Sequence, residues 1–196
     1  MKIASLDFET ANLSRVSMCA AGVALFEEGQ LIESKSWLIK PPKGHGFFKP
    51  EWTDDIHGLN WFSVKDAPEF PTVAPEVISL PLSADLVIAH YAPFDMDVLA
   101  QTLQHYQLPR PSFRYLCTCR LARAVWPDLP NHKLNTLAAH IGHSFQHHEA
   151  ESDAVAAGQV MLAMMKDAGV RCIETLCLKA GVESSLFIPH ETPHGN

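Results

Sequence analysis

Two carboxylates near the N-terminus are spaced for joint chemistry. Asp7 and Glu9 are two residues apart in a short run whose other members are apolar or small. Side chains alternate along a β-strand, so a strand here places both carboxylates on one face, with Cα atoms about 6.6 Å apart at a rise of ~3.3 Å per residue. Taken alone, the pair is most simply a solvent-facing strand end, because charged residues usually face water.

Three further residues change that interpretation. Asp95 follows an apolar run at 85–90, Asp153 begins a helical pattern at 151–167, and His148 precedes Asp153 in a histidine-rich loop. Four carboxylates gathered at strand ends and helix starts would repel one another in a partly buried site. Divalent cations such as Mg²⁺ relieve that repulsion, and two of them about 3.5–4 Å apart can hold the attacking and leaving oxygens of a phosphodiester. An imidazole beside them has a suitable pKa to take a proton from water.

Neighbouring polar residues have simpler explanations. Asp97 and Glu151 are acids in the first turn of a helix, where the helix dipole favours negative charge. His90 is interpreted as a structural histidine at a strand end. His147 and His148 are adjacent in a loop and are expected to point in different directions; motif spacing favours His148 as the functional residue.

The strands that must position these residues form a mixed pattern. Successive β-rich runs predict a meander with a hairpin turn at Glu28-Gly29, and later strands alternate with helices. This order predicts one mixed α/β sheet. The expected strands cover residues 2–9, 16–27, 30–40, 85–90 and 113–117.

Helices are expected where apolar residues recur at helical spacing. The chain should form one domain over residues 1–168 and a C-terminal extension over 169–196, packed on the domain or partly frayed. Residues 41–52, rich in Gly, Pro and aromatic residues, should form a surface loop. The expected helices cover residues 63–80 (interrupted by Pro68, Pro71 and Pro75), 93–108, 118–126, 134–141 and 151–167, with a short one before Gly181.

The composition of the 196-residue chain limits its class. Apolar residues make up 47% and charged residues 19%, which is enough for a core and excludes wholesale disorder. No run approaches the ~18 apolar residues needed to cross a bilayer. Asp7 and Glu9 also interrupt the place where a signal peptide would be apolar. The five cysteines include no Cys-x-x-Cys pair, so we expect a reduced, cytoplasmic protein without a membrane partner.

Charge is distributed unevenly along the chain. The net charge of −7 argues against a non-specific nucleic-acid coat. Residues 110–133 nevertheless hold five cations against one acid, whereas residues 66–109 contain no Lys or Arg. This basic stretch is either a solvated helix face or an edge beside the active site that contacts the phosphates of a nucleic acid. Arg120 and Arg123 are the candidate contacts.

Three short motifs stand in the order and spacing of a known enzyme family. They are Asp7-Phe8-Glu9-Thr10, His90-Tyr91-Ala92-Pro93-Phe94-Asp95 and His148-Glu149-Ala150-Glu151-Ser152-Asp153-Ala154. They resemble the motifs of the DEDDh 3′→5′ exonucleases, which include the proofreading epsilon subunit of bacterial DNA polymerase III. The segment Ile56-His57-Gly58-Leu59 is similar to the family's Ile-His-Gly-Ile near the terminal nucleotide. The likeness covers roughly residues 3–167.

The resemblance implies a fold, a mechanism and a set of contacts. The fold would be ribonuclease H-like, a mixed five-stranded sheet flanked by helices. Asp7 would bridge two Mg²⁺ or Mn²⁺ ions, Glu9 and Asp153 would complete one site, and Asp95 would support the other. His148 would deprotonate the attacking water, releasing nucleoside 5′-monophosphates. The residues expected to contact substrate are Phe8, Thr10, Ala11, His57, Phe94, Arg120 and Arg123.

The substrate and the partners are less closely specified. We expect single-stranded DNA rather than RNA, in repair or proofreading, with a DNA polymerase or another replication or repair protein as a candidate partner. Two alternatives stay open: an RNA-trimming exoribonuclease of the same superfamily, and an inactive nuclease fold used for binding. Tyr91 departs from the second motif, where the family usually has Asn, which puts the local loop in question.

Overall fold

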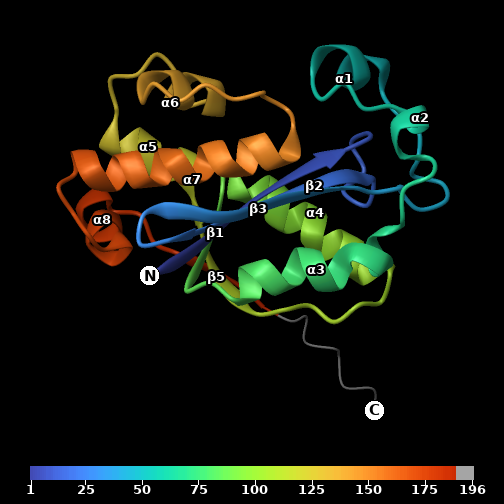
Figure 1. The fold of residues 1–196 in the computed structure, drawn as a ribbon, viewed down its shortest axis with the longest axis horizontal. Coiled ribbons are helices and arrows are strands. Elements are labelled where there is room, and N and C mark those ends of the chain that lie inside the picture. The colour runs from blue at the N-terminus through green and yellow to red at the C-terminus, as the bar shows by residue number, and fades with distance from the viewer. Residues whose placement is uncertain (189–196) are drawn as a thin grey trace.

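The computed structural model describes residues 1–188, apart from the side chains of residues 53–55, and contains one sheet between two layers of helices (Figure 1). The six strands lie in the order β3-β2-β1-β4-β5-β6. They are β1 (Lys2–Thr10), β2 (Met18–Glu27), β3 (Gln30–Leu38), β4 (Leu86–Ala89), β5 (Phe113–Cys117) and β6 (Ser185–Phe187).

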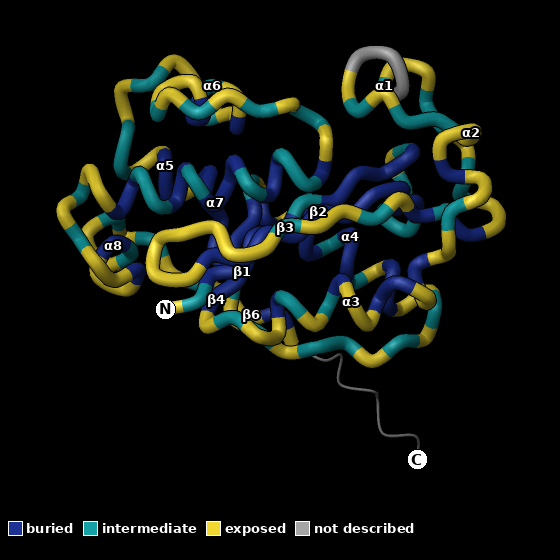
Figure 2. Tube along the Cα trace, viewed as in Figure 1, coloured by how far each residue is buried: buried dark blue, intermediate teal, exposed yellow. Residues whose placement is uncertain are grey.

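Strand β1 is the centre of the sheet. It pairs antiparallel with β2 and parallel with β4, so the mixed α/β prediction is confirmed. The predicted hairpin joins β2 to β3 through Glu28 and Gly29, which both have positive φ, at 50° and 82°. Such a turn matches the right-handed twist of the strands it connects. Strand β3 is an exposed edge, while β1 and β2 are almost wholly buried (Figure 2).

Helices cover both faces of the sheet. One face packs against α3 and α4, with Leu6 and Phe8 of β1 in its core. The other packs against α5, α6, α7 and α8, with Ile3 of β1 in its core. The helices are α1 (Pro50–Asp55), α2 (Trp61–Val64), α3 (Phe70–Leu82), α4 (Ala92–His105), α5 (Thr118–Val125), α6 (Leu134–His140), α7 (Ala150–Asp167) and α8 (Ile173–Ala180).

The structure differs from the sequence prediction in three places. The sheet has a sixth strand, because β6 from the C-terminal extension pairs with β5 and buries Phe187. The helix expected over 63–80 is two helices, α2 and α3, separated by a turn that contains Pro68. The loop expected over 41–52 gives way to α1 at Pro50. The predicted fraying concerns residues 189–196, which lie outside the described part.

Candidate active site

The carboxylates of the first motif lie at the end of the central strand. Asp7 and Glu9 share a face with Ile3, and this is the face that α7 covers. Helix α7 brings Asp153 to the same place, so that one carboxylate oxygen from each of Asp7, Glu9 and Asp153 lies within 4.8 Å of the other two. Asp7 and Glu9 therefore lie on one face of the strand, as expected, and α7 places Asp153 beside them.

A close approach between helix and sheet makes this meeting possible. Gly22 of β2 is the register partner of Asp7, and a Cβ atom there would lie only 2.0 Å from the Ala150 carbonyl oxygen. Further along α7, a Cβ atom on Gly158 would lie 2.0 Å from the Phe26 ring. Two glycines thus let α7 lie directly against β2, with Asp153 in its first turn beside β1.

Asp95 reaches the cluster from the opposite layer. It lies in the first turn of α4, is 2% exposed, and accepts a hydrogen bond at Oδ1 from the Phe8 backbone N–H, at 3.1 Å. Burial, and then the charges of Glu9 and Asp153, raise the pKa of Asp95 well above its usual range. Burial and the charges of Asp95, Glu9 and Asp153 do the same to the pKa of Asp7. Buried carboxylates this close together are stabilised by a cation, and their oxygen donors fit a divalent metal.

Both histidines of the loop before α7 face this cluster. The His148 backbone N–H donates to Asp153 Oδ2 at 2.8 Å, and its Nδ1 lies 3.8 Å from Glu9 Oε1. The Glu9 carboxylate, with Asp153 acting in the same direction, raises the pKa of His148. His147 Nδ1 donates to Asp153 Oδ1 at 2.8 Å.

The expectation that His147 and His148 point in different directions is wrong. Their rings stack with centroids 3.8 Å apart, because His148 adopts a left-handed backbone with φ of 68° that folds the two side chains to one side. A non-glycine residue in this region is uncommon, and such residues concentrate at functional sites.

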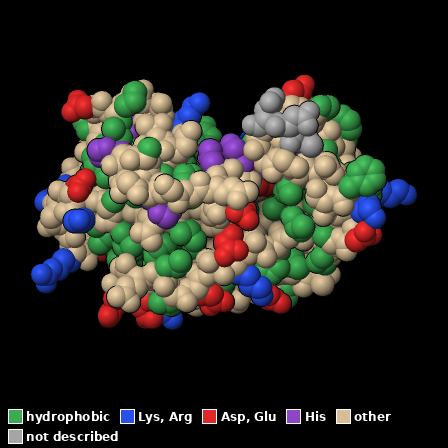
Figure 3. Space-filling view, turned by 45° about the horizontal axis from the view of Figure 1, so that its top comes forward, with side chains coloured by type: hydrophobic (Ala, Val, Ile, Leu, Met, Phe, Trp, Pro, Cys, Tyr) green, Lys and Arg blue, Asp and Glu red, His purple; other side chains and the backbone are tan. Residues whose placement is uncertain are grey.

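The cluster opens into a cleft of about 750 Å³. A second hollow of about 530 Å³ adjoins it and shares Glu9, Ile56, His147 and His148 with it. Figure 3 shows histidine side chains in the notch between the two raised parts of the molecule. The acids are therefore buried at their backs and accessible to a ligand from one side.

Comparison with known proteins shows the family to which the chain belongs. The sequence model of the RNase_T exonuclease family matches residues 5–161. The chain belongs to this exonuclease family. It is 30% identical over 163 residues to the DNA polymerase III PolC-type of Oceanobacillus iheyensis, an alignment that covers 82% of this chain and 11% of the relative. The corresponding protein of Caldanaerobacter subterraneus is 27% identical over 176 residues, 87% of this chain and 12% of the relative. The chain thus spans about a ninth of the length of these relatives.

Solved structures share the fold of this exonuclease. Exonuclease X in complex with 5′ overhanging duplex DNA has a TM-score of 0.69 at 21% identity, covering 91% of this chain and 99% of that one. The nuclease domain of 3′hExo, a DEDDh family member bound to rAMP, has a TM-score of 0.69 at 16% identity, covering 85% and 92%. These neighbours confirm the predicted ribonuclease H-like fold class. Within residues 1–188, no helix is both long and apolar enough to cross a membrane.

Some of the residues predicted to contact substrate line the cleft or the adjoining hollow, and others do not. Phe8, Phe94 and Arg123 line the main cleft, and His57 lines the adjoining hollow. The His57 ring is fixed from both sides, since Nε2 donates to the Thr10 carbonyl at 3.2 Å and Nδ1 accepts from the Leu59 N–H at 3.0 Å.

The remaining predicted contacts are not brought to the cleft. The side chains of Thr10 and Ala11 are buried, at 2% and 0% exposed. Arg120 is exposed on α5 and is not among the residues that line the cleft.

Two amides that line the cleft, Asn131 and Asn135, were not predicted as site residues, whereas Lys133 between them belongs to the basic stretch 110–133. Asn131 and Lys133 come from the segment that leads into α6, and Asn135 lies in the first turn of that helix. The pattern Asn-x-Lys-x-Asn spans the start of a helix, so no single period groups these side chains. The sequence does not show that these residues lie near β1, because that depends on the packing of α6 on α7.

His90 lies in the cleft wall with both ring nitrogens engaged. Nε2 donates to the His132 carbonyl and Nδ1 meets the Thr118 hydroxyl, each at 3.0 Å. Burial lowers the pKa of His90 to about 4, so the ring is neutral at physiological pH. This geometry agrees with a structural role for His90.

Proposed function

We propose that this exonuclease removes nucleotides one at a time from the 3′ end of single-stranded DNA, as nucleoside 5′-monophosphates, in proofreading or repair. The observation that carries the proposal is the convergence of Asp7, Glu9 and Asp153 with His148 in an open cleft. A terminal phosphodiester could enter there while the rest of the strand stays outside.

We propose Asp7, Glu9, Asp95 and Asp153 as ligands of two Mg²⁺ or Mn²⁺ ions. Burial, together with the charges of the neighbouring carboxylates, raises the pKa values of Asp7 and Asp95, and a bound cation would offset both effects. Asp95 has one oxygen committed to the Phe8 N–H, which leaves the other available for a metal or its water. When bound, the two cations would stabilise the attacking and leaving oxygens of the phosphodiester.

The side chains of this protein would handle the proton. His148 Nδ1 faces Glu9, so we assign Nε2 as the atom that accepts the proton of the attacking water. Glu9 favours the protonated imidazole that results. His147 holds Asp153 through its hydrogen bond and acts as a positioning residue. Phe94, which is half-buried in the cleft wall, would pack against the terminal nucleotide.

The preference for DNA rests on the relatives, which are named DNA polymerase III PolC-type. A DNA polymerase is accordingly the partner we propose, with the cytoplasm as the place of action; the five free cysteines are compatible with a reducing compartment. We also propose that residues 1–168 form the exonuclease domain and that residues 169–196 extend it. RNA is the second candidate, because 3′hExo, with the same fold, is bound to rAMP.

A matched pair of 5′-labelled DNA and RNA oligonucleotides of one sequence tests the proposal. In Mg²⁺ or Mn²⁺, the DNA should give a ladder that shortens from the 3′ end, at a higher kcat/KM than the RNA. A blunt DNA duplex should be degraded more slowly than the single strand. Faster degradation of the RNA would reject the DNA preference and favour the exoribonuclease alternative.

A further inference from the structure

A further hollow, separate from the cleft and from the hollow beside it, lies on the part of the molecule that carries α1 and α2. Its volume is about 590 Å³, and we name it the Lys–aromatic groove after Lys40, Lys43, Phe47 and Trp61, which line it. Phe47 is 69% exposed and Trp61 41% exposed, although large aromatic side chains are usually buried. Lys40 Nζ lies 5.9 Å from the centroid of the Trp61 ring, within the range of a cation–π contact.

Hydrogen bonds connect the groove to the residues that directly follow the active-site strand. Asn12, which follows β1, donates from Nδ2 to the carbonyls of His45 at 2.9 Å and Phe47 at 2.7 Å. The Lys49 N–H donates to the Ala11 carbonyl at 3.0 Å. Asn12 is the third residue after Glu9, so their Cα atoms lie at most about 11 Å apart. A strand whose end lies at Glu9 therefore reaches the groove within a few nucleotides.

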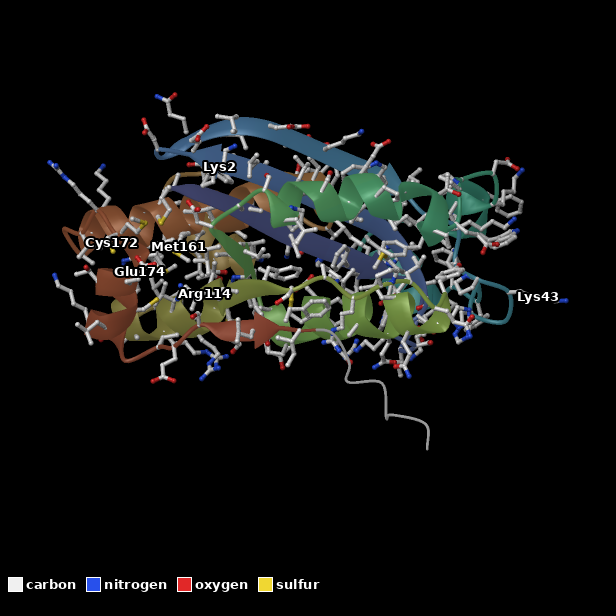
Figure 4. The ribbon with its side chains drawn as sticks, turned by 90° about the horizontal axis from the view of Figure 1, so that it is seen from below. Lys2, Lys43, Arg114, Met161, Cys172 and Glu174 are labelled. Carbon is white, nitrogen blue, oxygen red and sulfur yellow. The ribbon has the colours of Figure 1, made fainter. Side chains whose placement is uncertain are left out.

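The charge of the groove is unusual for this protein. Residues 40–49 hold three lysines and no acid, in a chain with a net charge of −7. Glu69, the acid in the groove wall, accepts a hydrogen bond from the Tyr106 hydroxyl at 3.0 Å. Lys43 extends from its loop into solvent (Figure 4), and Lys and hydrophobic side chains lie together on the right-hand part of Figure 3.

Cations beside exposed aromatic rings have one well-defined class of ligand. An unpaired nucleic-acid strand offers a phosphate to each lysine and a base face to each ring, and every base can stack. A duplex hides its base faces, and an acidic peptide offers no face to Phe47 or Trp61. We infer that the Lys–aromatic groove binds the single strand upstream of the 3′ end, with Phe47 and Trp61 as stacking surfaces and Lys40 and Lys43 as phosphate contacts. This inference rests on the proposed function, since it concerns the same substrate.

Binding without turnover tests the groove separately from catalysis. The experiment uses the Asp7→Ala protein in EDTA and a labelled single strand of roughly a dozen nucleotides, longer than the smallest sites of stacking-type binders. The Kd, followed by fluorescence anisotropy, should rise roughly 5- to 100-fold when Lys43→Ala and Phe47→Ala are added. DNA and RNA strands should both show the loss, and an unlabelled blunt duplex should compete poorly.

A matched control lies at the other end of the molecule. Leu178 is 84% exposed on α8, and Lys166 is exposed in the last turn of α7. Adding Leu178→Ala and Lys166→Ala removes the same kinds of side chain and should leave the Kd unchanged. Equal Kd values for the groove variant and this control would overturn the inference. So would competition by the duplex as strong as that by the single strand.

Turnover supplies a second, independent readout. In the protein with Asp7 intact, Lys43→Ala with Phe47→Ala should raise KM for the longer strand and leave hydrolysis of a dinucleotide unchanged, because a dinucleotide does not reach the groove. An equal loss on both substrates would assign these residues to the cleft itself and overturn the inference. If the unsubstituted enzyme shortened no oligonucleotide, the proposed function would fail, while the anisotropy result would still decide whether the groove binds a strand.

Discussion

At the scale of single residues, the site is defined by charges that the fold forces together. The four acids come from one strand and two helices in opposite layers, and burial raises the pKa values of Asp7 and Asp95. The motif spacing predicted the acids and the histidine that the structure brings together. It could not show that His147 faces Asp153, because that depends on the left-handed backbone of His148.

Substitution of the two histidines should separate their roles. His148→Ala should lower kcat by roughly 10²- to 10⁴-fold, the usual share of a general base. His147→Ala should have a smaller effect, since His147 acts on Asp153 through one hydrogen bond. Single-turnover rates on a short DNA strand, with circular dichroism to check folding, make the comparison. An unchanged rate for His148→Ala would remove His148 from the mechanism.

The lowered pKa of His90 predicts that the stability of the protein depends on pH. Its pKa is about 4 in the folded protein against 6.5 for an ordinary histidine, so the unfolded chain binds more protons between these values. The free energy of unfolding should fall as the pH is lowered through this window, by about 2–3 kcal/mol for this residue.

Urea unfolding of the wild type and His90→Gln at a series of pH values isolates this contribution. The stability advantage of the wild type should shrink steadily from pH 6.5 to pH 4. A constant difference across the window would mean that His90 keeps an ordinary pKa in the folded protein.

At the scale of elements, the decisive contact is that of α7 with β2. Periodicity was enough to predict β1, β5, α6 and α7 closely, because their apolar residues recur at regular spacing and Gly142 and Gly169 end their helices. It could not predict β6, whose three residues become a strand only by pairing with β5. The Pro-containing α3 was also obscured, although Pro71 in its first turn has no N–H partner to lose.

Gly158→Ala tests the contact of α7 with β2. Helix propensity alone favours alanine by about 1 kcal/mol. The new Cβ atom would nevertheless lie 2.0 Å from the buried Phe26 ring, and overpacking of this kind costs about 1–3 kcal/mol or more. We therefore expect net destabilisation in urea unfolding, together with lower activity, because Asp153 moves with the helix.

Gln159→Ala, at the next and half-buried position of α7, is the matched control and should change stability little. Shortening the opposing side chain, in the double variant Phe26→Leu with Gly158→Ala, should recover part of the loss. A Gly158→Ala protein as stable as the wild type would show that the helix does not need this close approach.

At the scale of the whole molecule, the net charge of −7 is a sum over two separate regions, one acidic and one rich in lysine. The acids gather at the end of β1, where metal ions would make the site attractive to phosphate. The lysines of residues 40–49 lie next to that site on a separate lobe. The net charge alone argued against a non-specific nucleic-acid coat. It does not reveal that the acids and the lysines are gathered in different places in the structure.

The most direct test of the central claim is the metal dependence of 3′-end shortening by the wild type and by Asp7→Ala. A 5′-labelled single-stranded DNA is incubated with each protein in EDTA, and then with Mg²⁺ or Mn²⁺ added. The wild type should be inactive in EDTA and should produce a ladder from the 3′ end once metal is restored. Asp7→Ala should stay folded and inactive throughout. A ladder in EDTA, or one made by purified Asp7→Ala, would contradict the assignment of these acids as the metal-binding centre.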